Sequence, residues 1–132
     1  MEITYKLNTT PVTEAIIDLY KSSGINRSTD DKKRIAKMYA NSNLIVTAWH
    51  NDKLVGISRS LTDLCCCCYL PDFAIRHEYR NLGIGKKLIA LTREKVGNQT
   101  MLLLLSAPSA MEYYPKINFQ KVKNGFIINR TT

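Results

Sequence analysis

One hexapeptide combines a basic residue with two glycines that a single position separates. It consists of Arg80, Asn81, Leu82, Gly83, Ile84 and Gly85, and Lys86 follows. Glycines let backbone N–H groups converge because no Cβ atoms stand between them. If a helix begins here, its first N–H groups are unpaired and carry a partial positive charge. The hexapeptide is therefore typical of an anion cradle, above all for phosphate.

The spacing of these residues excludes two common phosphate sites. A dinucleotide-binding turn has a third glycine three residues after the second, where this chain has Leu88. A P-loop has Ser or Thr after its Gly-Lys pair, but Gly85 and Lys86 are followed by Lys87, and no glycine stands five residues before Gly85. The remaining pattern is Arg-x-x-Gly-x-Gly, and it lies between an apolar segment and a helical pattern.

This pattern resembles the acyl-CoA-binding motif of the GNAT (Gcn5-related) N-acetyltransferase superfamily, Gln/Arg-x-x-Gly-x-Gly/Ala. After one more apolar segment, a second stretch is similar to the family signature Ala-x-x-aromatic-Tyr-x-x-x-Gly-Phe, and it runs from Ala110 to Phe119. It departs from that signature at Asn118, which replaces the glycine, and it has Pro115 directly after the tyrosine. Asparagine tolerates a left-handed backbone, whereas the proline should end or kink a helix that carries the tyrosine.

The resemblance implies acetyl-CoA as the cosubstrate and a primary amine as the acceptor, with no metal. It assigns the thioester arm to backbone groups of Phe73, Ala74 and Ile75. It assigns the rest of the cosubstrate to the cradle, which is Arg80, Asn81, Leu82, Gly83, Ile84, Gly85 and Lys86.

Two catalytic needs follow from direct attack of the amine on the thioester. The resemblance places Tyr114 as the group that protonates the leaving thiolate, although this transfer from a free tyrosine is uphill by about 2 kcal/mol. Tyr114 would then chiefly position the sulfur. The amine must also lose a proton, directly or through water. The candidate bases are Asp72, Glu78, Asp63 and His77, and Asp72 is nearest the expected break in the sheet.

Apolar patterns predict the elements that must position these groups. Strands are expected over residues 3–7, 44–50, 54–61, 64–75 and 100–106. Helices are expected from a Thr10 cap to Gly24, from a Ser28 or Thr29 cap to about residue 39, and from residue 83 to Gly97. Ser109 would cap a short helix that carries the tyrosines, and Asn124-Gly125 predicts a hairpin between 119–122 and 126–128.

The predicted fold class is α+β, with a mostly antiparallel mixed sheet and helices on both faces. Short turns make the second, third and fourth strands consecutive antiparallel neighbours. Pro71 cannot donate a ladder hydrogen bond, so a bulge or the last paired position is expected there. The family resemblance adds a split between the fourth and fifth strands. With 132 residues, the chain is expected to form one domain over residues 1–132.

Four consecutive cysteines, Cys65 to Cys68, are interpreted as small apolar core residues in a reducing compartment. Alternation along a strand prevents all four from surrounding one zinc ion. The N-terminus lacks the pattern of a secretory signal, and no apolar run approaches the ~20 residues of a membrane span. We therefore expect a cytoplasmic protein with no membrane partner.

The net charge of +8 is uneven, with +2 over residues 1–66 and +6 over residues 67–132. This field favours an anionic cosubstrate, and nucleic acid is the main rival, although no nucleic-acid-binding motif supports it. The alternatives left open are an acyl-CoA-binding domain without turnover, a nucleic-acid-binding module, and a GNAT-like toxin acting on aminoacyl-tRNA. Arg27 is the only charged residue in the loop expected to meet the acceptor. Exposed strand edges would permit a homodimer.

Overall fold

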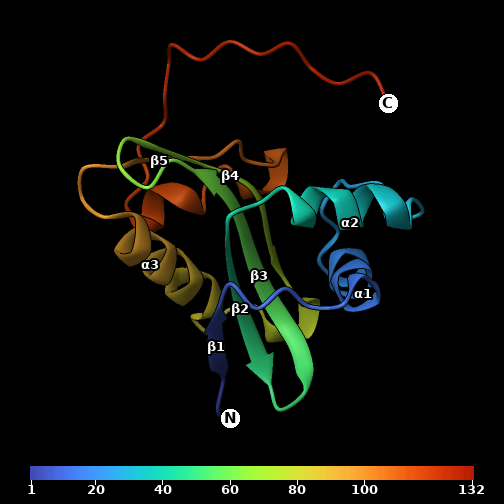
Figure 1. Cartoon of the computed structure of the whole chain (residues 1–132). Coiled ribbons are helices and arrows are strands. Elements are labelled where there is room, and N and C mark those ends of the chain that lie inside the picture. Colours follow the sequence, from blue (N-terminus) through green and yellow to red (C-terminus); the bar gives the residue numbers. More distant parts are fainter.

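The computed structural model describes residues 1–132, and its centre is a five-stranded sheet (Figure 1). The strands are β1 (Thr4–Leu7), β2 (Leu44–His50), β3 (Lys53–Thr62), β4 (Cys67–Ile75) and β5 (Met101–Leu103). The helices are α1 (Thr13–Ser23), α2 (Lys32–Ala40) and α3 (Ile84–Val96), with 3₁₀ turns η1 (His77–Tyr79), η2 (Pro108–Ala110) and η3 (Tyr114–Ile117).

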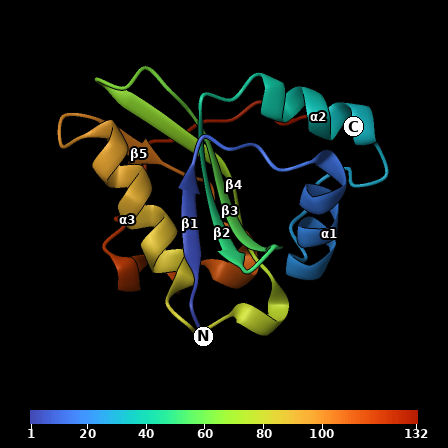
Figure 2. The same ribbon diagram turned by 60° about the horizontal axis from the view of Figure 1, so that its bottom comes forward.

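The strands lie in the order β1-β2-β3-β4-β5. The first four are antiparallel to their neighbours, and β5 runs parallel to β4. Short turns join β2, β3 and β4, as predicted. The mixed sheet with helices on both faces confirms the expected fold class (Figure 2).

The two faces of the sheet have separate apolar cores. Helices α1 and α2 cover one face, where Ile16, Leu19 and Ile35 are buried against Ile57. Helix α3 covers the other face and buries Ile84 and Leu88 against β2 and β3, together with Leu44, Val46 and Val55. Each such side chain contributes about 1.5–3 kcal/mol to folding. The sheet is therefore held from both sides, as a central layer should be.

Two predicted helix starts are wrong by two or three residues. Helix α1 begins at Thr13 rather than after Thr10, because Val12 keeps an extended backbone (φ −60°, ψ 147°). Helix α2 is capped by Asp31, whose carboxylate accepts the Arg34 N–H at 3.0 Å, rather than by Ser28 or Thr29. The predicted end of α1 is confirmed, since Gly24 is left-handed (φ 78°).

The prediction that all four cysteines lie in the core is wrong for three of them. Cys65, Cys66 and Cys67 are exposed, and only Cys68 is buried. The cause is the Asp63 carboxylate, which accepts the backbone N–H groups of Cys65, Cys66 and Cys67 at 2.8–3.0 Å. It folds these residues into a turn, so β4 begins at Cys67 rather than at residue 64.

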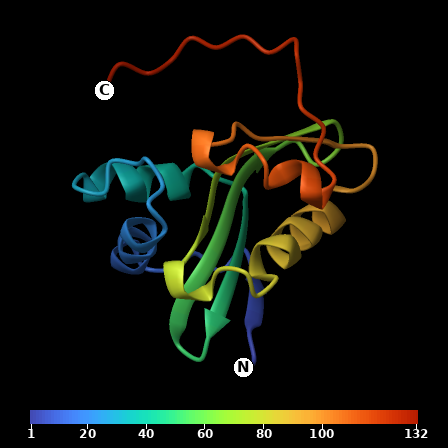
Figure 3. The same ribbon diagram turned by 180° about the vertical axis from the view of Figure 1, so that it is seen from behind.

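The C-terminal part of the chain is less regular than predicted. β5 is three residues long, and the tyrosine segment forms η2 and η3 rather than a helix capped by Ser109. The expected hairpin over 119–128 is absent, and the chain from Gln120 to Thr132 is extended and exposed (Figure 3). An isolated hairpin is marginal in water, and this one has no further strand to pair with. We call residues Gln120 to Thr132 the tail.

Candidate active site

The sheet opens between β4 and β5. Their parallel pairing covers only three positions, of which Tyr69 with Leu103 is the last. Beyond it, the edge of β4 from Leu70 to Ile75 has no β5 partner. The register of β3 with β4 also shifts here, because one residue of β3 stands opposite Leu70 and Pro71. This confirms the predicted bulge and leaves backbone groups at the opening free to bind a ligand.

The predicted anion cradle lies between η1 and α3. Asn81 (φ 64°) and Gly83 (φ 82°) are both left-handed, and Gly83 directly precedes the first turn of α3. No acidic residue occupies that turn, and a shallow hollow borders Gly83, Lys86 and Lys87. A Cβ atom at Gly83 would meet nothing within 4 Å, so the approach is open. These features suit the negatively charged phosphates of a nucleotide cosubstrate.

Arg80 of the cradle is directed toward α1. Its guanidinium donates to the Ser23 carbonyl oxygen at 2.6 Å. The end of α1 is joined to η1 as well, because the His77 N–H donates to the Ser22 hydroxyl at 3.0 Å. The start of the cradle is thus fixed to the C-terminal end of α1.

Four aromatic rings gather beside the opening. Phe73 of β4 stacks on Tyr113, with ring centroids 6.5 Å apart, and lies 6.2 Å from Tyr114. Tyr114 also meets Phe119 edge to face at 5.5 Å. Gly85 is needed for this packing, since a Cβ atom there would lie 2.8 Å from the Tyr113 hydroxyl and 2.9 Å from the Phe73 ring. The cradle glycine and the tyrosine segment are therefore in direct contact.

Tyr114 is half-buried in this group. Burial raises the pKa of its hydroxyl above the usual value, and the neighbouring Tyr113 raises it further. The phenol is therefore protonated at neutral pH. No protein group hydrogen-bonds its hydroxyl, so the proton is available to a ligand. η3 accommodates Pro115 in its first turn, and Asn118 adopts the left-handed backbone expected of it (φ 73°).

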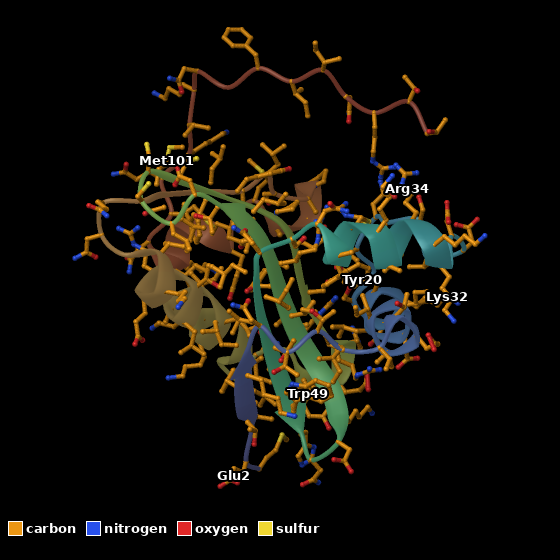
Figure 4. All side chains as sticks on the ribbon, viewed as in Figure 1. Glu2, Tyr20, Lys32, Arg34, Trp49 and Met101 are labelled. Carbon is orange, nitrogen blue, oxygen red and sulfur yellow. The ribbon has the colours of Figure 1, made fainter.

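Asp72 lies on the opposite face of β4, in a buried polar cluster with Arg27, Arg59, Tyr20 and Tyr39. One carboxylate oxygen accepts from Arg27 Nε at 2.6 Å, and the other accepts from Arg59 Nε at 3.0 Å and from the Tyr20 hydroxyl. The Tyr20 and Tyr39 hydroxyls share a further hydrogen bond. Figure 4 shows Tyr20 between the helices and the sheet. We call these five residues the Asp72 cluster.

The Asp72 cluster fixes the charge of its members. Burial alone would raise the pKa of Asp72, but Arg59, Tyr20 and Arg27 together hold it below its usual value. Burial raises the pKa of Tyr20 and of Tyr39 well above the ordinary range. At neutral pH the carboxylate is thus ionised and both phenols are protonated. Of its three partners, Arg27 alone is partly exposed, with 25% of its side chain accessible.

The other candidate bases lie elsewhere. Asp63 belongs to the turn before β4, where backbone N–H groups of the cysteines lower its pKa. Glu78 is on the surface at η1 and accepts from Ser22 at 3.5 Å, and His77 is also exposed. The structure therefore brings Asp72 and the loop residue Arg27 together at the bulge, and separates Asp63 from them.

Sequence reasoning missed three members of the Asp72 cluster, Tyr20, Tyr39 and Arg59. The two tyrosines lie on the buried faces of α1 and α2, and their spacing indicates the packing of their rings but not the hydrogen bonds of their hydroxyls. Arg59 carried a usable signal, because it is a charged residue inside the apolar run of β3 and is only 7% exposed. A buried charge of this kind requires a partner.

The chain contains no group of three or more His, Cys, Asp or Glu residues arranged to hold a metal ion. None of its helices has the length and apolar character needed to cross a membrane.

Comparisons with known proteins agree with this geometry. The sequence profile described as "Acetyltransferase (GNAT) domain" matches residues 19–130. No curated protein matches the chain closely enough to count as a relative.

Several solved structures share the fold. A Staphylococcus aureus protein of unknown function, described as a probable acetyltransferase, is 18% identical with a TM-score of 0.82, over 98% of this chain and 100% of that one. The GNAT family protein SP0256 from Streptococcus pneumoniae is 23% identical with a TM-score of 0.73, over 98% and 99%. The aminoglycoside N-acetyltransferase AAC(6')-Iy, solved with CoA, is 12% identical with a TM-score of 0.73, over 99% and 96%.

Proposed function

The chain belongs to the GNAT acetyltransferase family, and we propose that it transfers an acetyl group from acetyl-CoA to a primary amine by direct attack. The observation that carries this proposal is the juxtaposition of the left-handed Gly83 cradle, the unpaired edge of β4 and the Tyr114 hydroxyl at one opening of the sheet.

The cosubstrate would lie along the opening between β4 and β5. The first N–H groups of α3, with Lys86 nearby, would bind the pyrophosphate, because both favour negative charge. The pantetheine arm is a chain of amides, and it would bond to backbone groups of Phe73 and Ile75, which face the unpaired edge. The backbone groups of Ala74 face β3, because the Arg76 N–H donates to the Val55 carbonyl oxygen at 2.8 Å and successive residues of a strand alternate in direction. A solved relative is an N-acetyltransferase in complex with CoA, which supports this use of the fold.

Tyr114 would serve the leaving group. Its hydroxyl is protonated and has no protein partner, so it can donate to the sulfur as negative charge develops there. The raised pKa makes complete proton transfer to a thiolate less favourable than from a free tyrosine, which is already uphill by about 2 kcal/mol. We therefore assign to Tyr114 chiefly the hydrogen bond that stabilises and positions the thiolate.

Asp72 would receive the amine. Direct removal of a proton from an amine near pKa ~10 by a carboxylate near ~4 is uphill by about 8 kcal/mol. The carboxylate would therefore hold the ammonium group, and the proton would leave through water to the bulk solvent, which costs about 4 kcal/mol at pH 7 for an amine near pKa ~10. Because Arg27 Nε occupies one carboxylate oxygen at 2.6 Å, Arg27 must move before the amine binds. Its partial exposure permits this movement.

A thermal-unfolding experiment with acetyl-CoA, CoA and ATP tests the cosubstrate. A ligand at a hundredfold its dissociation constant stabilises the folded state by about 2.7 kcal/mol, which is a shift of several degrees. We expect this shift with acetyl-CoA and CoA but not with ATP. The variant Lys86→Glu should reduce it, whereas the control Lys33→Glu, at an exposed residue of α2, should not. Equal shifts with ATP, or no shift at all, would contradict the proposal.

A radiolabelled transfer assay with a panel of amines then tests turnover. Binding of acetyl-CoA without transfer to any amine would identify an acyl-CoA-binding domain. Transfer that requires charged tRNA would identify an aminoacyl-tRNA acceptor instead.

A further inference from the structure

The tail is unusually apolar for a segment that nothing covers. Phe126 and Ile128 are fully exposed, Ile127 is 65% exposed and Val122 is 53% exposed. No backbone group from Gln120 to Asn129 makes a backbone hydrogen bond. Soluble proteins rarely leave neighbouring large apolar side chains bare unless a partner covers them.

The outer edge of β5 is a second feature without a partner, and it lies in the same third of the chain as the tail. β5 is the last strand of the sheet, and only its β4 side is paired. Its outer edge is open. Met101 at the start of β5 is 57% exposed, and Leu105, two residues past its end, is 59% exposed. An unpaired apolar edge is a template for another strand.

The tail does not cover this edge in its own molecule. It leaves the body after Phe119 and arches over it toward α2 (Figures 1 and 3). Its end is held there, because Arg34 donates to the Thr132 carbonyl oxygen at 3.2 Å and Arg130 donates to that of Asn26 at 3.4 Å. Figure 4 shows Arg34 directed toward the tail and Met101 far from its end.

We propose that the tail segment Phe126–Asn129 adds as a strand to the open β5 edge of a second copy of this chain. The two features complement each other, since one is an unpaired β-prone segment and the other an unpaired apolar edge. A second copy carries both, so reciprocal exchange closes a two-fold dimer and leaves neither feature bare. The six residues 120–125 can span about 20 Å when extended, which lets the segment stand clear of its own molecule.

The nature of the exposed side chains favours a protein partner over nucleic acid. The tail carries Lys121, Lys123 and Arg130 and no acidic residue, which would suit a polyanion. Its exposed centre is Phe126 with two isoleucines, however, and branched aliphatic side chains give bases no flat surface for stacking. The alternation of Phe126 and Ile128 on one side with Ile127 on the other matches strand pairing.

The test measures molar mass by light scattering over a hundredfold range of protein concentration, on the full chain. We expect a dimer for the natural sequence and a monomer, or dimerisation at least tenfold weaker, for the double variant Phe126→Asp/Ile128→Asp. Both side chains are free in the monomer, so the variant should fold and should keep its thermal shift with CoA. The control Val12→Asp/Leu7→Asp places the same two charges at other exposed apolar residues and should remain dimeric.

Three outcomes would overturn the proposal. A natural chain that is monomeric throughout, with tail amides protected from hydrogen exchange, would mean that the tail folds onto its own β5. A dimer that survives in the double variant would mean that another surface pairs. A mass increase only when RNA is added would assign the tail to nucleic acid. None of these results bears on acetyl-CoA binding, which the thermal shift measures separately.

Discussion

Asp72 and Phe73 are adjacent residues of β4, yet they face opposite sides of the sheet and different chemistry. Asp72 lies among two arginines and two tyrosines, where both carboxylate oxygens have partners. Phe73 lies among rings beside Gly85, where packing rather than hydrogen bonding decides its position. The comparison teaches that the proposed acceptor side depends on a few directed contacts, whereas the cosubstrate side depends on backbone shape and close packing.

The largest expected effect is on the acceptor side. Asp72→Asn should lower the free energy of unfolding by about 3–5 kcal/mol, because it leaves the buried guanidinium of Arg59 without a countercharge. Denaturant unfolding measures this loss. The exposed turn residue Asp52 provides the control, and Asp52→Asn should change stability by less than about 0.5 kcal/mol. Equal stability of the two variants would contradict the role assigned to the Asp72 cluster.

The next effect separates chemistry from packing. Tyr114→Phe should lower turnover by on the order of ten- to a thousandfold, because the hydroxyl that stabilises the thiolate is lost while the ring remains. Its stability should stay close to that of the natural chain, since no protein group bonds that hydroxyl. Tyr113→Phe is the matched variant and should retain most activity. Unchanged turnover in Tyr114→Phe would remove this residue from the mechanism.

A smaller effect tests the close packing on the cosubstrate side. Gly85→Ala places a methyl group 2.8 Å from the Tyr113 hydroxyl and 2.9 Å from the Phe73 ring. Overpacking of this kind costs about 1–3 kcal/mol, part of which the better helix propensity of alanine offsets. Combining it with Tyr113→Phe should restore some stability and CoA binding. Purely additive losses in that double variant would show that the contact with Tyr113 is not the cause.

The smallest expected effect is a dependence of the free energy of unfolding on pH in the acidic range. The pKa of Asp72 in the folded state is held below its value of about 3.9 in the unfolded chain. The folded state therefore binds fewer protons, so this contribution is present above about pH 4 and is lost as pH falls through the folded pKa. Thermal unfolding between pH 7 and pH 3 should show a steeper decline for the natural chain than for Asp72→Asn. Parallel curves would indicate that other carboxylates govern acid unfolding.

The sequence predicted the parts of the fold that depend on local pattern. The order and pairing of β2, β3 and β4 follow from apolar runs and short turns, and Gly24 and Gly97 end their helices as expected. The bulge at Pro71 followed from its missing N–H. The cradle was identified from glycine spacing, and its left-handed Asn81 and Gly83 agree with that interpretation.

What the sequence did not predict depends on contacts between distant segments. The Asp72 cluster joins residues from α1, the following loop, α2, β3 and β4, and no local pattern links them. The exposed cysteines were misjudged because one side chain, Asp63, redirects the backbone before the strand begins. The predicted hairpin after residue 119 is absent for a related reason. Asn124-Gly125 favours a turn, but the two short strands beside it are stable only when a further strand pairs with them.

The brief pairing of β5 with β4 has a further consequence, for the order in which the protein folds and opens. Backbone pairing joins everything after residue 100 to the sheet at three positions only, whereas β2, β3 and β4 are linked by short turns and pair over many residues. Local pairings form early and release late. The last third of the chain should therefore dock late in folding and detach first, which would widen the opening while the β1–β4 sheet stays intact.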